Sequence, residues 1–205
     1  MAFATIDVTK GITGTIPVAN GGTGLASGTT GQFLKFTGTT TLASAAAGGI
    51  TSASQLRLTA DITTGSLSAG IITGTWELND TTGYASIGSP VTQSSGIFTF
   101  PSTGIWQVTF NLALYEDTGG TDTITLQMIG TRDNFSSDND LVEDYTTVID
   151  PYSNSSMVGK IIYDVTNTSN DKMKFGVSGL ASGNYIRGNT NKNSTYVTFI
   201  RLGDT

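Results

Sequence analysis

Five acidic residues lie within a dozen positions of one another in the second half of the chain: Asp133, Asp138, Asp140, Glu143 and Asp144. Hard cations such as calcium bind several carboxylate oxygens, and two carboxylates that flank a glycosidic bond can hydrolyse it. The spacing lacks the central glycine and the terminal glutamate of an EF-hand, and acidic loops are usually just solvated. Asp138, Asp140 and Glu143 are therefore the metal candidates of this chain, but we expect no bound metal or other cofactor.

The chain contains neither histidine nor cysteine. Their absence excludes Ser-His-Asp and Cys-His catalysis, imidazole and thiolate metal sites, and disulfides. The glycine-rich stretch at residues 20–24 is not a phosphate-binding loop, because no Gly-Lys-Ser/Thr follows it and no GxGxxG spacing opens a helix. We therefore expect a protein that is not an enzyme, and a polysaccharide depolymerase is the enzymatic alternative left open by the carboxylates.

Tyrosines near turn-forming segments are the second candidate for binding chemistry. Tyr115, Tyr145, Tyr152 and Tyr185 could stack on the apolar faces of sugars. Packing at the corners of a β-sandwich, or between subunits, is the alternative interpretation.

Charge and hydropathy limit the partners. Charged residues make up 13% of the chain, compared with roughly 25% in typical soluble domains. The net charge is −6 and the ten basic residues are dispersed, so neither nucleic acid nor an anionic membrane is an expected partner. No apolar run is long enough to span a membrane, and residues 1–7 lack the basic and apolar regions of a signal peptide. We expect synthesis in a cytoplasm.

Residues 14–40 carry apolar side chains singly among glycine, threonine and serine. One copy of such a segment buries too little surface to offset the entropy of ordering its backbone, so we expect an extended arm that orders on a partner. The apolar residues that would make those contacts are Ile16, Val18, Phe33 and Phe36.

The segments next to this arm have a different composition. Residues 42–47 favour a short helix, ended by Gly48 and Gly49. Residues 50–85 are a connector or the first strands of the globular part. We therefore divide the chain into an arm with connector at residues 1–85 and a globular domain at residues 86–205.

Short strands at regular spacing are predicted from about residue 86 onward. Residues 105–114 alternate, with Trp106 and Phe110 on one face and Gln107 and Thr109 on the other, as in a half-buried antiparallel strand. Further strands are predicted at residues 97–100, 123–129, 145–149, 157–165, 172–177 and 195–202, with turn-rich segments between them. This pattern indicates an all-β protein with an antiparallel sandwich or jelly roll.

Two stretches near the beginning of the chain resemble signatures of bacteriophage tail-fibre and related virion proteins. They are residues 17–24, PVANGGTG, and residues 28–34, GTTGQFL. The resemblance implies a structural protein on the surface of a phage virion, made in the cytoplasm of the bacterial host and attached through its N-terminal arm to major capsid or tail proteins.

Two stretches of the globular part resemble the globular heads of complement-type and tumour-necrosis-factor-like proteins. They are residues 96–110, GIFTFPSTGIWQVTF, and residues 193–202, NSTYVTFIRL. The resemblance implies a ten-strand jelly roll that forms a homotrimer with aromatic residues around a threefold axis. The aromatic residues expected in the core or between the subunits are Phe98, Phe100, Trp106, Phe110, Tyr196 and Phe199.

Two roles remain open for such a trimeric knob. In the first, it decorates and cements the capsid, which suits an arm of about 85 residues that is short for a fibre at roughly 3.3 Å per residue. In the second, it is the tip of a tail fibre and recognises a glycan on the host surface.

Overall fold

The computed structural model describes residues 23, 25, 28–39, 41–45, 48–117, 122–148 and 151–205. The chain forms two compact units, residues 1–49 and residues 50–205, which we call the N-terminal unit and the knob.

The N-terminal unit contains one antiparallel hairpin. Strand β1 (Phe33–Phe36) pairs with β2 (Leu42–Ala45), and Phe36 lies opposite Leu42. The predicted helix at residues 42–47 is therefore wrong for its described part, residues 42–45. Alanine has the highest helix propensity, but propensity is a weak determinant, and pairing with the aromatic-rich segment before it outweighs it.

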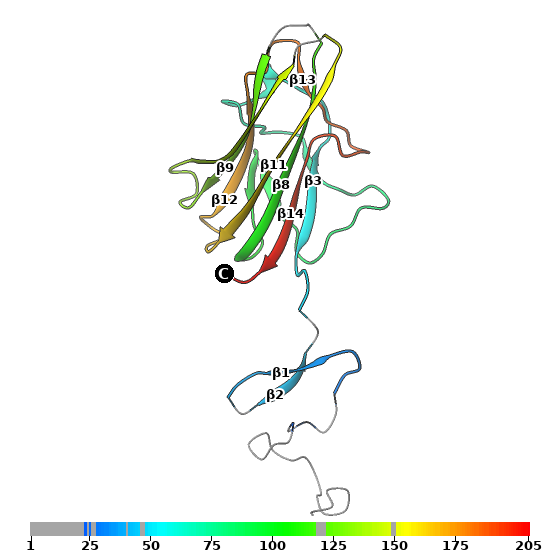
Figure 1. Ribbon diagram of the computed structural model, residues 1–205, viewed down its shortest axis with the longest axis vertical. Coiled ribbons are helices and arrows are strands. Elements are labelled where there is room, and N and C mark those ends of the chain that lie inside the picture. Colours follow the sequence, from blue (N-terminus) through cyan, green and yellow to red (C-terminus); the bar gives the residue numbers. More distant parts are fainter. Residues whose placement is uncertain are drawn as a thin grey trace, which may run out of the picture. The chain divides into compact units, whose positions relative to one another are not determined.

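The knob consists of two antiparallel sheets (Figure 1). The first, which we call the β9 sheet, has the following strand order: β10 (Asn139–Val148), β9 (Asp122–Thr131), β12 (Lys172–Ser178), β7 (Ile97–Thr99) and β6 (Thr92–Ser94).

The second, which we call the β8 sheet, is built around the long strand β8 (Gly104–Tyr115). On one side β8 pairs with β11 (Asn154–Val165), and on the other with β14 (Tyr196–Gly203) and the short β13 (Tyr185–Ile186). Beyond β14 come β3 (Ala53–Leu58) and β5 (Trp76–Leu78), and β13 pairs with β4 (Ile62–Thr63). A short 3-10 turn, Thr64–Ser66, follows β4.

This arrangement confirms the predicted all-β antiparallel jelly roll. The compact knob begins at residue 50, so of the two interpretations of residues 50–85 the structure has the first strands of the globular part. Strand β3 lies inside the β8 sheet, between β14 and β5, and Leu56 pairs with Val197. A pairing between segments so distant in the chain leaves no local signal in the sequence, so residues 50–85 resemble a connector when they are considered alone.

The core between the sheets is rich in aromatic rings. Phe98 is fully buried, and its ring centroid lies 5.3 Å from that of Trp76, 4.8 Å from Phe175 and 5.7 Å from Phe199. Edge-to-face and offset pairs of this kind add to the stabilisation from burial. Five of the six aromatic residues named above lie in this core: Phe98, Phe100, Trp106, Phe110 and Phe199. The sixth, Tyr196, is only partly buried.

The knob has two distinct ends. Gly104 begins β8 opposite Val165, and Ile105 lies opposite Gly203; this is the proximal end, where the chain enters at residue 50 and where its C-terminus lies (Figure 1). Gly104 has a φ of +136°, and a Cβ there would lie 2.5 Å from the Gly203 carbonyl oxygen, so only glycine fits this turn. Strand β8 ends at Tyr115, which marks the distal end.

Candidate functional site

The acidic residues proposed as a metal site do not come together. Asn139–Val148 is a strand, β10, rather than a loop. The Asp138 carboxylate lies 3.8 Å from Lys174 Nζ, and the Tyr145 hydroxyl donates to Glu143 at 2.6 Å, which raises the pKa of Tyr145. Asp140 pairs through its backbone with Ile129. Among the described residues, no three potential ligands gather in a way that would hold a metal ion.

Two other aspartates hold turns. The Asp133 carboxylate accepts hydrogen bonds from the Ser137 hydroxyl at 2.6 Å, the Ser137 amide at 3.0 Å and the Thr131 hydroxyl at 2.7 Å. These bonds, the Ser137 hydroxyl foremost, lower the pKa of Asp133 to about 2. Asp133 therefore fixes the turn after β9.

Asp171 is buried, at 1% exposure, beside the turn that follows β11. Burial by itself raises the pKa of Asp171, but hydrogen bonds from the Asn167 and Thr166 amides and the Thr166 hydroxyl, together with Arg132, outweigh it and hold the pKa below its usual value. This carboxylate also has a structural role.

The outer face of the β8 sheet is the first of two candidate binding surfaces in the knob. Its residues alternate with the core residues of β8, β11 and β14 and are partly or fully exposed. We define it as Ile105, Gln107, Thr109, Asn111, Val158, Lys160, Ile162, Tyr196, Thr198 and Ile200. Lys160 is the only charged residue in this set. Asp164, the next residue after Ile162 on the same side of β11, lies opposite Ile105 and is partly buried. Val158 and Ile162 are more than half exposed.

Strand register aligns these residues in rows across the sheet. Ile162, Gln107 and Ile200 form one row, and Val158, Asn111 and Tyr196 form another. Lys160, Thr109 and Thr198 lie between them. The result is a nearly uncharged face whose apolar side chains extend toward the proximal end, where Ile105 is located.

Arg57 closes this face at the β3 edge. Its side chain is fully buried, with Nε 2.7 Å from Glu77, Nη2 2.8 Å from Asp80, and the guanidinium over the ring of Tyr84. Its Nη1 has no hydrogen-bond partner. Residues 77–84 therefore cover the outer side of β3 and limit the exposed face to β11, β8 and β14.

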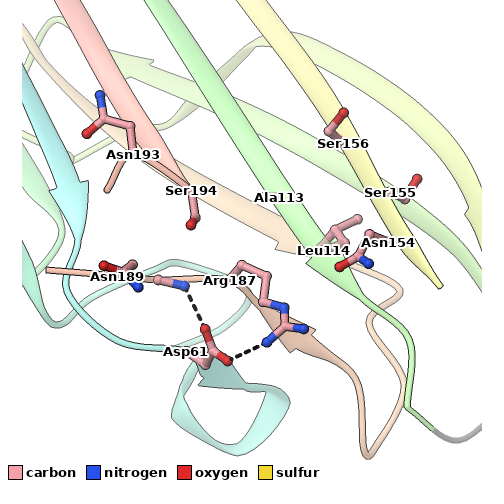
Figure 2. Close-up of a pocket in the computed structure, with 11 residues that line it drawn as sticks. Asp61, Ala113, Leu114, Asn154, Ser155, Ser156, Arg187, Asn189, Asn193 and Ser194 are labelled. Carbon is pink, nitrogen blue, oxygen red and sulfur yellow. Dashed lines mark hydrogen bonds and ion pairs between the residues drawn. The ribbon is translucent and has the colours of Figure 1, made fainter. Parts of the chain in front are cut away.

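The second candidate surface is a groove of about 610 Å³ at the distal end of the same sheet. Figure 2 shows Asn193 and Ser194 on one side of β8, Asn154 and Ser156 on the other, and Asp61 with Arg187 closing one end. The groove is lined by Asp61, Ala113, Leu114, Asn154, Ser155, Ser156, Arg187, Gly188, Asn189, Asn193 and Ser194.

An ion pair organises the closed end of this groove. Arg187 Nη1 lies 3.0 Å from Asp61 Oδ2, and the Gly188 amide donates to the other carboxylate oxygen at 2.9 Å. The Arg187 guanidinium also lies over the Tyr115 ring, 4.1 Å from its centroid, and Tyr115 lies beside Tyr185 across the strand pair. Asp61 and Arg187 are 126 positions apart, so no local pattern in the sequence identifies them.

The four tyrosines proposed for sugar stacking separate into different places. Tyr115 and Tyr185 are neighbours at the distal end. Tyr152 is 73% exposed in the segment before β11, and Tyr145 is 61% exposed on β10 in the other sheet. The structure therefore brings together two of the four.

The N-terminal hairpin exposes large apolar side chains. Phe33, Leu34 and Phe36 are 64%, 54% and 65% exposed. Leu34 and Phe36 share one face of the strand with their partners Ser44 and Leu42, whereas Phe33 points to the opposite face. Ile16 and Val18, the other predicted attachment residues, lie outside the described residues.

No helix in the described part of the chain is long and apolar enough to cross a membrane.

Comparison with known proteins identifies the fold alone. No family model matches the chain, and no curated protein is similar to it in sequence. Among solved structures, Eiger TNF from S. frugiperda superposes with a TM-score of 0.56 at 12% identity, over 75% of this chain and 93% of that one. Murine APRIL at pH 8.0 gives a TM-score of 0.50 at 11% identity, over 74% and 98%. The knob thus has a TNF-like jelly-roll fold, as its two sequence stretches implied.

Proposed function

We propose that this chain is a non-enzymatic structural protein of a tailed-phage virion, a homotrimeric surface knob attached to the particle through its N-terminal segment, where it decorates and cements the capsid. One observation carries the proposal: the knob buries five phenylalanines and both tryptophans in its own core, whereas the hairpin before it leaves Phe33, Leu34 and Phe36 exposed. The phage-like stretches at residues 17–24 and 28–34 support a virion partner for this segment.

Self-association through the outer face of the β8 sheet is the first part of the proposal. A sheet face with few charges and several exposed β-branched side chains is better covered by another copy than by water. Threefold symmetry follows from the resemblance to trimeric heads and is consistent with the TNF-like fold. Val158 and Ile162 then lie between subunits, together with Tyr196.

Sedimentation of the full chain tests this part. The wild type is expected to sediment as a trimer, and the double variant Val158→Asp/Ile162→Asp as a folded monomer, because it places uncompensated charges between subunits. Tyr145→Asp is the matched control, since Tyr145 is equally exposed on the other sheet. A monomeric wild type contradicts the proposal.

Attachment through the N-terminal segment is the second part. A segment of this kind binds by adding strands to capsid proteins or by lying between them, with many small backbone and apolar contacts. Phage particles assembled with the chain lacking residues 1–45 are expected to lose the knob and to have heads that break more readily on heating, while adsorption to the host is unchanged.

A receptor-binding fibre tip is the second candidate function, and the distal groove favours it. The groove and the Tyr115–Tyr185 pair lie at the opposite end of the knob from the point where the chain enters it. If this is the function, Tyr115→Ala, Tyr152→Ala or Tyr185→Ala abolishes adsorption while trimers persist. Normal adsorption by all three variants favours the cement role.

A further inference from the structure

The distal groove offers hydrogen-bonding groups that the chain itself does not use. The side chains of Asn154, Ser156 and Ser194 make no hydrogen bond within the described part of the chain, although all three line the groove. Asp61 and Arg187 are paired but remain more than a third exposed. Donors and acceptors therefore converge on one concave surface, which is how proteins bind small polar ligands.

The shape of the groove comes from rigid strands. Ala113 of β8 forms its floor, and its small side chain leaves the hollow between Ser156 of β11 and Ser194, just before β14 (Figure 2). The Arg187 amide also donates to the Ala113 carbonyl at 2.8 Å, which fixes the loop carrying Arg187 to the strand. A volume of about 610 Å³ lies in the usual range for ligand sites.

The charges in the groove favour an uncharged ligand. The positive charge of Arg187 is compensated by Asp61 at 3.0 Å, so the groove has no net charge with which to attract an anion. The remaining polar side chains are amides and hydroxyls, which exchange hydrogen bonds with hydroxyl groups in both directions. Tyr115 and Tyr185 do not line the groove; they lie next to each other beside Arg187, whose guanidinium covers the Tyr115 ring.

The groove borders the face assigned to self-association but shares no residue with it. The apolar side chains Ile105, Ile162 and Ile200 lie toward the proximal end, whereas the groove begins beyond Val158 and Asn111, at Ser156 and Ala113. A trimer interface that ends at the row of Val158, Asn111 and Tyr196 leaves the distal groove open.

From these observations we propose that the distal groove is a carbohydrate-binding site for neutral oligosaccharides, with Asn154, Ser156, Ser194, Asp61 and Arg187 bonding to sugar hydroxyls. The inference rests on the proposed function only in requiring that the distal end point away from the particle. Such a site lets the knob bind neutral surface glycans, whether the protein cements the capsid or forms a fibre tip.

Saturation-transfer NMR with the full-length chain tests the site. The probes are tetrasaccharides of glucose, mannose, galactose and N-acetylglucosamine, with tetragalacturonate as the anionic comparison. At least one neutral probe is expected to bind. Asn154→Ala is expected to weaken the affinity for that probe about fivefold, which is the effect of one lost hydrogen bond. Ser156→Trp is expected to abolish binding by filling the groove.

Asn170→Ala is the matched control, because Asn170 is an exposed asparagine in the turn at the proximal end whose side chain makes no hydrogen bond, and binding by this variant should be unchanged. The proposal is overturned if no neutral probe binds, if only tetragalacturonate binds, or if binding survives Ser156→Trp. Sedimentation of the same samples separates the two claims: a trimer that binds no sugar refutes the groove alone, whereas a monomer refutes the proposed assembly.

Discussion

The N-terminal hairpin and the knob are both built from antiparallel strands, but they differ in the exposure of their phenylalanine side chains. Phe36 in β1 is 65% exposed, whereas Phe98 in β7 is fully buried between two sheets. The difference is the number of layers, because a two-stranded hairpin has no second layer against which to bury its side chains. We therefore expect the hairpin to need a partner to cover its apolar side chains, whereas the knob has a core of its own.

The largest effect on stability is expected from the loss of a core aromatic ring. Phe98→Ala is expected to lower the free energy of unfolding of the knob by about 3–5 kcal/mol, because it removes contacts with three other rings and leaves a cavity. Phe36→Ala is expected to change it by less than about 0.5 kcal/mol. Urea unfolding followed by tryptophan fluorescence reports on the knob, where both tryptophans lie. Equal effects of the two variants contradict the comparison.

The knob buries a charge as well, and this gives the next largest effect. Glu77→Gln is expected to destabilise the knob by about 2 kcal/mol, because Arg57 stays buried with one carboxylate fewer. Arg57→Met removes the buried charge itself and is expected to cost less than Glu77→Gln. Thermal unfolding measures the loss of stability in each variant. A larger loss in Arg57→Met than in Glu77→Gln contradicts this account of Arg57.

Acid gives a smaller and more local effect. Asp133 has its pKa lowered to about 2, so its contribution to the turn is complete above about pH 4 and is lost as the pH falls toward 2. The protection factor of the Ser137 amide against hydrogen exchange should therefore fall over this range, and Asp133→Asn should have a low protection factor already at pH 7. Residues 28–45 contain no acidic residue, so the hairpin should show no such transition.

The smallest effect is expected on the exposed surface of β10. Tyr145→Phe removes the hydroxyl that donates to Glu143 at 2.6 Å, but both groups are exposed. The free energy of unfolding should change by less than about 0.5 kcal/mol. If chemical denaturation shows that the free energy of unfolding falls by more than about 1 kcal/mol, β10 depends on this contact. That result would contradict the small effect expected at the edge of the sheet.

Alternating hydrophobicity predicted the central strand of the knob. In β8 every second residue from Trp106 to Leu114 is buried, as the sequence pattern indicates for a half-buried strand. The same alternation predicted Trp106 and Phe110 in the core, whereas Phe98, Phe100 and Phe199 were expected there from the resemblance of their stretches to tumour-necrosis-factor-like heads. These features are local, so one stretch of sequence contains all the information needed.

Features that depend on distant segments could not be predicted in this way. Strand β10 has acidic residues because it is a sheet edge open to solvent, and composition alone made part of it resemble a loop. The alanine-rich β2 becomes a strand only by pairing with β1. The groove requires Asp61 to meet Arg187, a contact created by the pairing of β4 with β13.

The dependence of the hairpin on an outside partner is tested most directly by hydroxyl-radical footprinting of the full-length chain, alone and in virions. Phe33 and Phe36 are expected to be labelled in the isolated protein and protected in the virion, while Phe98 is protected in both. Protection of Phe33 and Phe36 in the isolated chain, or their continued labelling in the virion, contradicts the account.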